Sequence, residues 1–156
     1  MFLQVMEPKT SWNKIQKGKG ITNYRNCLCL FGIKLKDILG YIMPKLLLQP
    51  LVENSIYHGI KLKKGNGHIK VTGRRKENIV VFKIIDDGVG MDADRLNQIM
   101  YASSVSTENY GVGNINDRIK LQYGKEYGLK YYSKPGKGTI VVITLPYETE
   151  GGKNNA

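Results

Sequence analysis

In this sequence an apolar stretch with helical periodicity is followed directly by two β-rich runs. Pro44 suits the first turn of a helix over residues 44–58, and Gly59 suits its end. The runs 68–74 and 79–85 are separated by a polar segment that contains Lys76, Glu77 and Asn78, and predict a β-hairpin. A helix that buries one apolar face against a hairpin predicts an α+β fold. The residues that form this apolar face are Leu47, Leu48, Leu51, Val52 and Ile56.

The sequence after residue 91 repeats the alternation of helices and strands. Asp92 can cap a short helix that ends near Met100, and residues 101–110 are polar, small and unpatterned, as in a mobile loop. Further elements are expected as a helix over 114–123 that is closed by Gly124, and strands over 129–133 and 139–145. These elements predict a two-layer α/β sandwich, in which a mixed, mostly antiparallel sheet carries helices on one face.

The length of 156 residues and the hydrophobic content of 41% fit one domain with a real core. We expect this domain over residues 26–147, preceded by a linker or loosely docked arm at 1–25 and followed by a flexible tail at 148–156. Neither a signal peptide nor an apolar run of roughly 20 residues is found, so we expect a soluble chain. Cys27 and Cys29 lie too close together for an ordinary disulfide and are expected to be reduced.

The formal charge of +11 favours an anionic partner, such as a nucleotide, a nucleic acid or a membrane surface. The lysines are spread along the chain and do not form one dense block. We therefore expect no nucleic-acid partner, although a basic nucleic-acid-binding module remains the alternative from another class.

A first candidate site lies on the helix over 44–58. Its helical spacing places Pro50, Asn54, Tyr57 and His58 on one stripe, opposite the leucines. The amide oxygen of Asn54 suits a Mg²⁺ ion that takes few protein ligands, and Glu53 could position or deprotonate a hydroxyl or water. An ordinary polar helix surface would show the same pattern.

A second candidate site follows the strand over 79–85. The carboxylate of Asp86 could accept a hydrogen bond from an exocyclic amine, which would distinguish adenine from guanine. Gly88 and Gly90, followed by Met91, would let the backbone approach a base without an intervening Cβ. A plain Asp-Gly turn explains the same residues equally well.

Two glycine-containing segments complete the candidates. Gly111 and Val112 precede the helix that contains Arg118, and a helix N-terminus after flexible backbone suits a phosphate. The turn that ends in Lys137, Gly138 and Thr139 could place Lys137 or Thr139 near a phosphate, but a simple hairpin turn is favoured there. Neither a Walker-type loop nor a dinucleotide fingerprint is present.

In this order and spacing, the segments resemble the boxes of the ATPase superfamily of gyrase, the heat-shock chaperone, histidine kinases and the mismatch-repair ATPases. The closest resemblance is to LytS/YesM-type sensor histidine kinases. It is carried by MPKLLLQPLVENSIYHGI (N box), DDGVGM (G1 box), NYGVGNINDRIKLQYG (G2 box) and GKGTIVVITLP (terminal glycine box).

The resemblance implies a Bergerat-type fold with a mobile ATP lid at 101–110, and ATP and Mg²⁺ as cofactors. It implies that Asn54 binds Mg²⁺ and Asp86 reads adenine. Gly88 and Gly90 would then form the base-side loop, and Gly111 the phosphate-side loop. Glu53 is only a candidate base, because Pro50 stands where many histidine kinases have an acidic or amide residue. Tyr57 replaces a frequent lysine, so His58, Lys137 or Arg118 would meet the phosphate charge.

The implied activity is phosphoryl transfer from Mg-ATP to a histidine on a separate domain; a protein serine kinase of the same superfamily is the alternative. The only histidines, His58 and His68, do not lie in a segment that resembles a phosphoacceptor helix. The implied partners are therefore the dimerisation and phosphoacceptor domain of a parent kinase and a downstream response regulator. The domain would be cytoplasmic, and the parent would reach the membrane through N-terminal segments that this chain lacks.

Overall fold

The computed structural model describes residues 3–5, 20–24, 27–36, 38, 41–44, 47–101 and 112–147. Along the chain the elements are β1 (Leu3–Val5), β2 (Gly20–Tyr24), β3 (Cys27–Lys36), β4 (Ile42–Pro44), α2 (Leu48–Asn54), the π-helical turn η1 (Ser55–Ile60), β5 (Gly67–Lys76), β6 (Ile79–Asp86), α3 (Ala93–Tyr101), α4 (Val112–Tyr123), β7 (Gly128–Lys134) and β8 (Gly138–Pro146). None of the helices in these ranges is long and apolar enough to cross a membrane.

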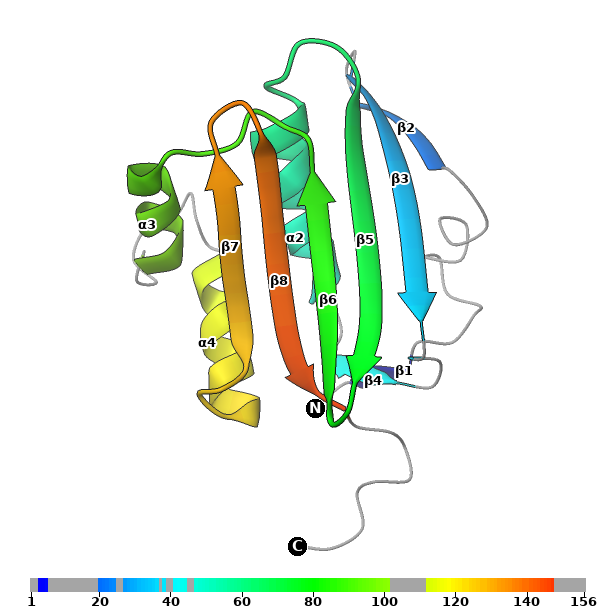
Figure 1. Cartoon of the computed structure of the whole chain (residues 1–156), viewed down its shortest axis with the longest axis vertical. Coiled ribbons are helices and arrows are strands. Elements are labelled where there is room, and N and C mark those ends of the chain that lie inside the picture. The colour runs from blue at the N-terminus through cyan, green and yellow to red at the C-terminus, as the bar shows by residue number, and fades with distance from the viewer. Residues whose placement is uncertain are drawn as a thin grey trace, which may run out of the picture.

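The main sheet has six strands in the order β2-β3-β5-β6-β8-β7. β3 and β5 run parallel, and every other neighbouring pair is antiparallel. Figure 1 shows α2 and α4 behind this sheet, while its front face carries none of the described helices. The predicted two-layer α+β architecture, with a mixed, mostly antiparallel sheet and helices on one face, is therefore confirmed.

The hydrophobic core lies between the sheet and the helices. Along β5, β6 and β8, buried and more exposed residues alternate, as expected for strands with one covered face. From the sheet, the inward side chains include Phe82, Ile84 and Ile143, all fully buried. From the helical layer, the core receives Leu48, Leu51, Val52, Ile56, Ile60, Ile115 and Ile119. The burial of Leu48, Leu51, Val52 and Ile56 confirms the apolar face predicted for the first helix.

The predicted start of the first helix was wrong. Pro44 lies in the short strand β4, where it pairs with Leu3, and the helix begins at Leu48. Pro50 therefore occupies the first helical turn, where a missing N–H leaves no hydrogen bond unmade. Gly59 does not end the helix either, because η1 continues to Ile60. Position 59 requires glycine for another reason, which is the close contact of η1 with Asp86.

The remaining predicted elements agree closely with the structure. Asp92 caps α3, since its Oδ1 accepts a hydrogen bond from the Arg95 N–H at 2.8 Å. Gly124, at φ +110°, donates its N–H to Lys120 O and ends α4. The segment expected to be a linker or arm contains two strands that were not predicted, β1 and β2, and β2 pairs with β3. Its role as a linker, like the tail at 148–156, stays a prediction.

Candidate functional site

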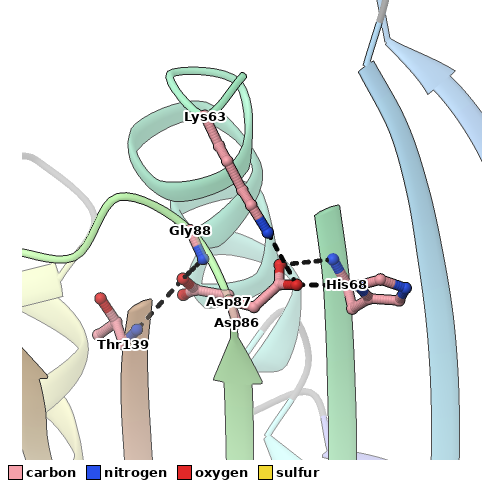
Figure 2. Close-up of polar contacts among 6 residues, drawn as sticks. All are labelled: Lys63, His68, Asp86, Asp87, Gly88 and Thr139. Atoms are coloured by element: carbon pink, nitrogen blue, oxygen red, sulfur yellow. Dashed lines mark hydrogen bonds and ion pairs between the residues drawn. The ribbon is translucent and has the colours of Figure 1, made fainter. Parts of the chain in front are cut away.

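The site is built around Asp86, the last residue of β6. Its side chain is almost completely buried, at 3% exposure. Oδ1 accepts hydrogen bonds from the Gly88 N–H at 3.0 Å and the Thr139 N–H at 3.2 Å, as Figure 2 shows. Burial raises the pKa of this carboxyl, and hydrogen bonds from Gly88, Ser55 and Thr139 oppose that rise. Hydrogen bonds from the loop after β6, from η1 and from β8 thus fix the orientation of this carboxyl, with Oδ1 as an acceptor.

The turn η1 lies directly against the end of β6. A Cβ on Gly59 would lie 2.9 Å from Asp86 Oδ1, and a Cβ on Gly88 would overlap the backbone of Gly59. The backbones are joined by a hydrogen bond from Val89 N–H to Gly59 O at 3.2 Å. Glycine at 59 and 88 thus lets helix and strand approach without side chains between them. The Ser55 hydroxyl reaches Asp86 from the preceding turn, so the helix that carries Asn54 borders the carboxylate.

Asp87 links three further segments beside this contact. Its Oδ1 accepts the His68 N–H at 2.7 Å, and its Oδ2 lies 2.8 Å from His68 Nδ1 and 2.9 Å from Lys63 Nζ. Figure 2 shows Lys63 descending from the loop after η1, and His68 approaching from the neighbouring strand β5. Partial burial would raise the pKa of Asp87, but the bonds from His68 and Lys63 lower it to about 2. Adjacent carboxyls therefore have pKa values shifted in opposite directions.

The Asp87 contacts predict a specific pH dependence of stability. Because the folded-state pKa of Asp87 is depressed, its stabilising contribution is present above the ordinary value of 3.8 and is lost as the pH falls toward about 2. The difference in unfolding free energy between the parent and Asp87→Asn should be about 1 kcal/mol or less at neutral pH, since the carboxylate is 43% exposed. Urea unfolding of both proteins should show this difference shrinking below about pH 4. A difference that grows as the pH falls would contradict the assignment.

The β7–β8 hairpin connects to the same region through Ser133. Its Oγ accepts the Met91 N–H at 2.8 Å, and lies 3.0 Å from Gly138 O and 2.9 Å from Thr139 Oγ1. The Gly136 N–H also bonds Val89 O at 2.7 Å. The loop after β6 is thus held between η1 on one side and the hairpin on the other.

A family model described as "Histidine kinase-, DNA gyrase B-, and HSP90-like ATPase" matches residues 42–149. The chain belongs to this ATPase family. The matched region includes α2, η1 and the loop after β6, so the elements around Asp86 lie within the family domain.

Relatives of this ATPase domain include sensor kinases. The chain is 35% identical over 121 residues to Sensor histidine kinase YesM of Bacillus subtilis. The aligned residues cover 77% of this chain and 20% of YesM. It is 34% identical over 110 residues to Sensor protein LytS of Staphylococcus epidermidis, and this alignment covers 69% of this chain and 18% of LytS. The chain therefore spans about a fifth of the length of these relatives.

Solved structures confirm the fold of this ATPase domain. The catalytic domain of histidine kinase ThkA superposes with a TM-score of 0.58 at 15% identity, covering 76% of this chain and 78% of that chain. Acinetobacter baumannii histidine kinase AdeS gives a TM-score of 0.56 at 14% identity, and the superposition covers 78% of this chain and 55% of the AdeS chain. The expected Bergerat-type fold is therefore correct.

In the ATPase domain, several predicted site residues come together. Asp86, Gly88 and Thr139 share hydrogen bonds, and Met91 and Gly138 both contact Ser133. Gly90, at φ +67°, lies against the backbone of Lys134 and Gly138. The second and fourth predicted segments therefore form one structural unit, in which Gly138 and Thr139 border the carboxylate.

Other predicted residues lie further from Asp86 or outside the described ranges. Glu53 is exposed and accepts a hydrogen bond from Gln49 Nε2 at 2.9 Å, and Asn54 is half-buried on the same helix. Tyr57 is 43% exposed with the Lys61 ammonium 5.3 Å from its ring centroid, and His58 is exposed. Val112 begins α4, Arg118 is exposed on α4, and Lys137 is exposed in the β7–β8 turn. Of the ATP lid expected at 101–110, Tyr101 ends α3, while residues 102–110 and Gly111 lie outside the described residues.

Four residues of the site were missed. Ser55, Ser133, Lys63 and His68 all bond to the aspartates or to the loop after them. The hairpin register carried a usable signal for His68, because pairing of Ile69 with Asp86 places His68 beside Asp87. Ser55 and Ser133 carried none, since lone serines occur throughout loops and helices.

Proposed function

We propose that this chain is the ATP-binding catalytic domain of a sensor histidine kinase. It would transfer the γ-phosphoryl group of Mg-ATP to a histidine on another domain. The observation that carries the proposal is the buried Asp86 carboxylate, fixed between η1 and the β8 backbone. Membership of the ATPase family and similarity to YesM and LytS support it.

Asp86 supplies recognition of the base in this proposal. An ionised carboxylate can only accept hydrogen bonds, which suits the 6-amino group of adenine and opposes the 6-oxo group of guanine. The Gly88 N–H and Thr139 N–H hold Oδ1 in place. The energetic cost of burying this charge is therefore borne by the fold before a nucleotide arrives, which is a form of preorganisation.

The phosphate end of the nucleotide would lie along the helical layer. Asn54 is half-buried one residue before Ser55, and its amide oxygen fits the sparse protein coordination of a phosphate-bound Mg²⁺ ion. The bound ion would neutralise charge on the β- and γ-phosphates. The backbone N–H groups at the start of α4, which begins at Val112, suit phosphate oxygens. Glu53, exposed on α2, is the candidate base for the attacking histidine.

Replacing Asn54 by alanine should weaken Mg-ATP binding without affecting metal-free ATP. We expect a loss of at least about tenfold, or about 1.4 kcal/mol, when Mg²⁺ is present, because one ligand of the ion is removed. Calorimetric titrations with excess Mg²⁺ and with a chelator measure the two values. Gln49→Ala is the matched control, since Gln49 is an exposed amide on the same helix. Equal losses with and without Mg²⁺ would contradict a role for Asn54 at the ion.

The activity is tested by phosphoryl transfer between separate proteins. The chain is mixed with γ-labelled Mg-ATP and a separately expressed phosphoacceptor domain of the parent kinase. Acid-labile label on that domain is expected, and its subsequent loss to a response regulator would identify the further partner. Transfer to a serine, with acid-stable label, would overturn the histidine kinase proposal. The membrane attachment of the parent, through segments outside this chain, is part of the same proposal.

A further inference from the structure

The sheet face opposite α2 and α4, which is turned toward the viewer in Figure 1, carries a concentration of positive charge that the nucleotide site does not use. The outward positions of β5, β6, β7 and β8 include no aspartate or glutamate. They hold six exposed cations, which we call the basic sheet face: Lys70, Arg74, Lys76, Lys83, Lys130 and Lys134. Of these cations, none forms an ion pair with a carboxylate of the described residues.

Cross-strand register places these cations around an apolar centre. Lys70 pairs with Ile85, Ile85 with Ile140, and Ile140 with Tyr132, so one row crosses β5, β6, β8 and β7. The next row contains Lys83, Val142 and Lys130. Tyr132 is 56% exposed and Ile140 is 37% exposed. With strands about 4.8 Å apart, these rows span about 14 Å from β5 to β7.

We propose that the basic sheet face binds the surface of an anionic phospholipid membrane. Lysines near an anionic lipid surface are attracted to the negative surface potential, and each increases binding by about fivefold. Tyr132, an aromatic side chain with a polar tip, and Ile140 can enter the headgroup region between the lysines. The face therefore combines the charge and the apolar area that peripheral membrane binding requires.

Two other anionic partners fit this face less well. Specific protein interfaces are depleted in lysine and enriched in arginine, whereas five of these six cations are lysines. Single-stranded nucleic acid requires aromatic side chains for stacking, and Tyr132 is the only phenylalanine, tyrosine or tryptophan at the outward positions of β5 to β8. The aliphatic centre formed by Ile85, Ile140 and Val142 offers nothing to a phosphate backbone.

Vesicle sedimentation of the whole chain tests the proposal. Binding to vesicles of phosphatidylcholine with about one third phosphatidylglycerol is expected to exceed binding to pure phosphatidylcholine by at least about tenfold, and to fall as salt is added. Lys83→Glu with Lys130→Glu should reduce binding by at least about twenty-five-fold, because two attractive charges are lost.

The matched control is Lys64→Glu with Lys125→Glu, which lie in loops outside the basic sheet face. Each pair lowers the net charge by four, from +11 to +7, so only position distinguishes them. The control should keep most of the binding. Circular dichroism checks that the variants fold. If the variant with Lys83→Glu and Lys130→Glu does not fold, Lys83→Gln with Lys130→Gln takes its place.

Three results would overturn the proposal. One is equal binding to neutral and anionic vesicles, and another is an equal loss of binding in the two charge-matched pairs. The third is binding to an oligonucleotide or an acidic protein that depends on Lys83 and Lys130, with none to the vesicles. Because none of these measurements includes ATP, failure here leaves the proposed nucleotide site untouched.

Discussion

Replacing Asp86 by asparagine is expected to reduce ATP affinity by about a hundredfold, while leaving the domain folded. The asparagine Oδ1 can still accept the Gly88 and Thr139 N–H groups, which hold the carboxylate in the parent. Its amide NH₂ would then face the 6-amino group of adenine, so two donors would oppose each other. The same change turns an unfavourable contact with the 6-oxo group of guanine into a favourable one. Calorimetric titrations with ATP and GTP measure both effects.

The stability of the Asp86→Asn variant separates a functional role from a structural one. Burial raises the pKa of Asp86, so at neutral pH ionisation of this carboxyl makes the folded state less favourable than it would be with a neutral group. A neutral amide avoids that cost, and the thermal midpoint of the nucleotide-free variant should equal or exceed that of the parent. Unchanged ATP affinity and unchanged preference over GTP would refute the adenine-reading role. Asp86→Ala is a poorer probe, since it leaves two buried N–H groups without an acceptor.

The regular elements after residue 47 could be predicted because their determinants are local. The alternation along β5 and β6, the Asp92 cap and the Gly124 stop each depend on residues close in sequence. The choice between Pro44 and Pro50 for the first turn could not be made locally. Both prolines suit that position, and Pro44 is instead in β4 because it pairs with Leu3, about forty residues earlier in the chain. The strand β3 was missed although its apolar start, followed by alternation over residues 33–36, offered a signal.

In the candidate site, too, some residues could be predicted from the local sequence and others could not. Asp86 was predicted because a carboxylate that ends an apolar strand is visible in the sequence. Ser55 was not, because its contact with Asp86 depends on how closely η1 approaches β6. That approach requires Gly59 and Gly88 together, and a single glycine in either segment gives no indication of the other. Gly59 was accordingly interpreted as a helix stop. That interpretation does not explain why glycine stands within η1, where a side chain would collide with Asp86.

Replacing Gly138 by alanine is expected to be the most destabilising single change in the hairpin. Gly138 adopts φ +81°, which L-residues disfavour, and a Cβ there would overlap the backbone carbonyl of Asp86. Backbone cannot move aside as a flexible side chain can, so β8 would have to separate from β6 where Thr139 bonds Asp86. We expect a loss of about 3 kcal/mol or more, a large fraction of the 5–15 kcal/mol typical of a domain. Urea unfolding measures this loss.

Gly136 in the same turn provides the matched control. It also has a positive φ, +74°, but a Cβ there meets nothing within 4 Å. Gly136→Ala should therefore cost only the backbone strain, about 1 kcal/mol. The difference between the two variants isolates the close contact with Asp86 from the cost of the left-handed conformation. Equal losses would show that backbone strain alone explains the cost at Gly138, and that the close approach to the Asp86 carbonyl adds nothing to it. A Gly138→Ala variant that stays folded but binds ATP weakly would instead show that the hairpin positions the site, through the Thr139 bond to Asp86 or through the Ser133 contact with Gly138 O.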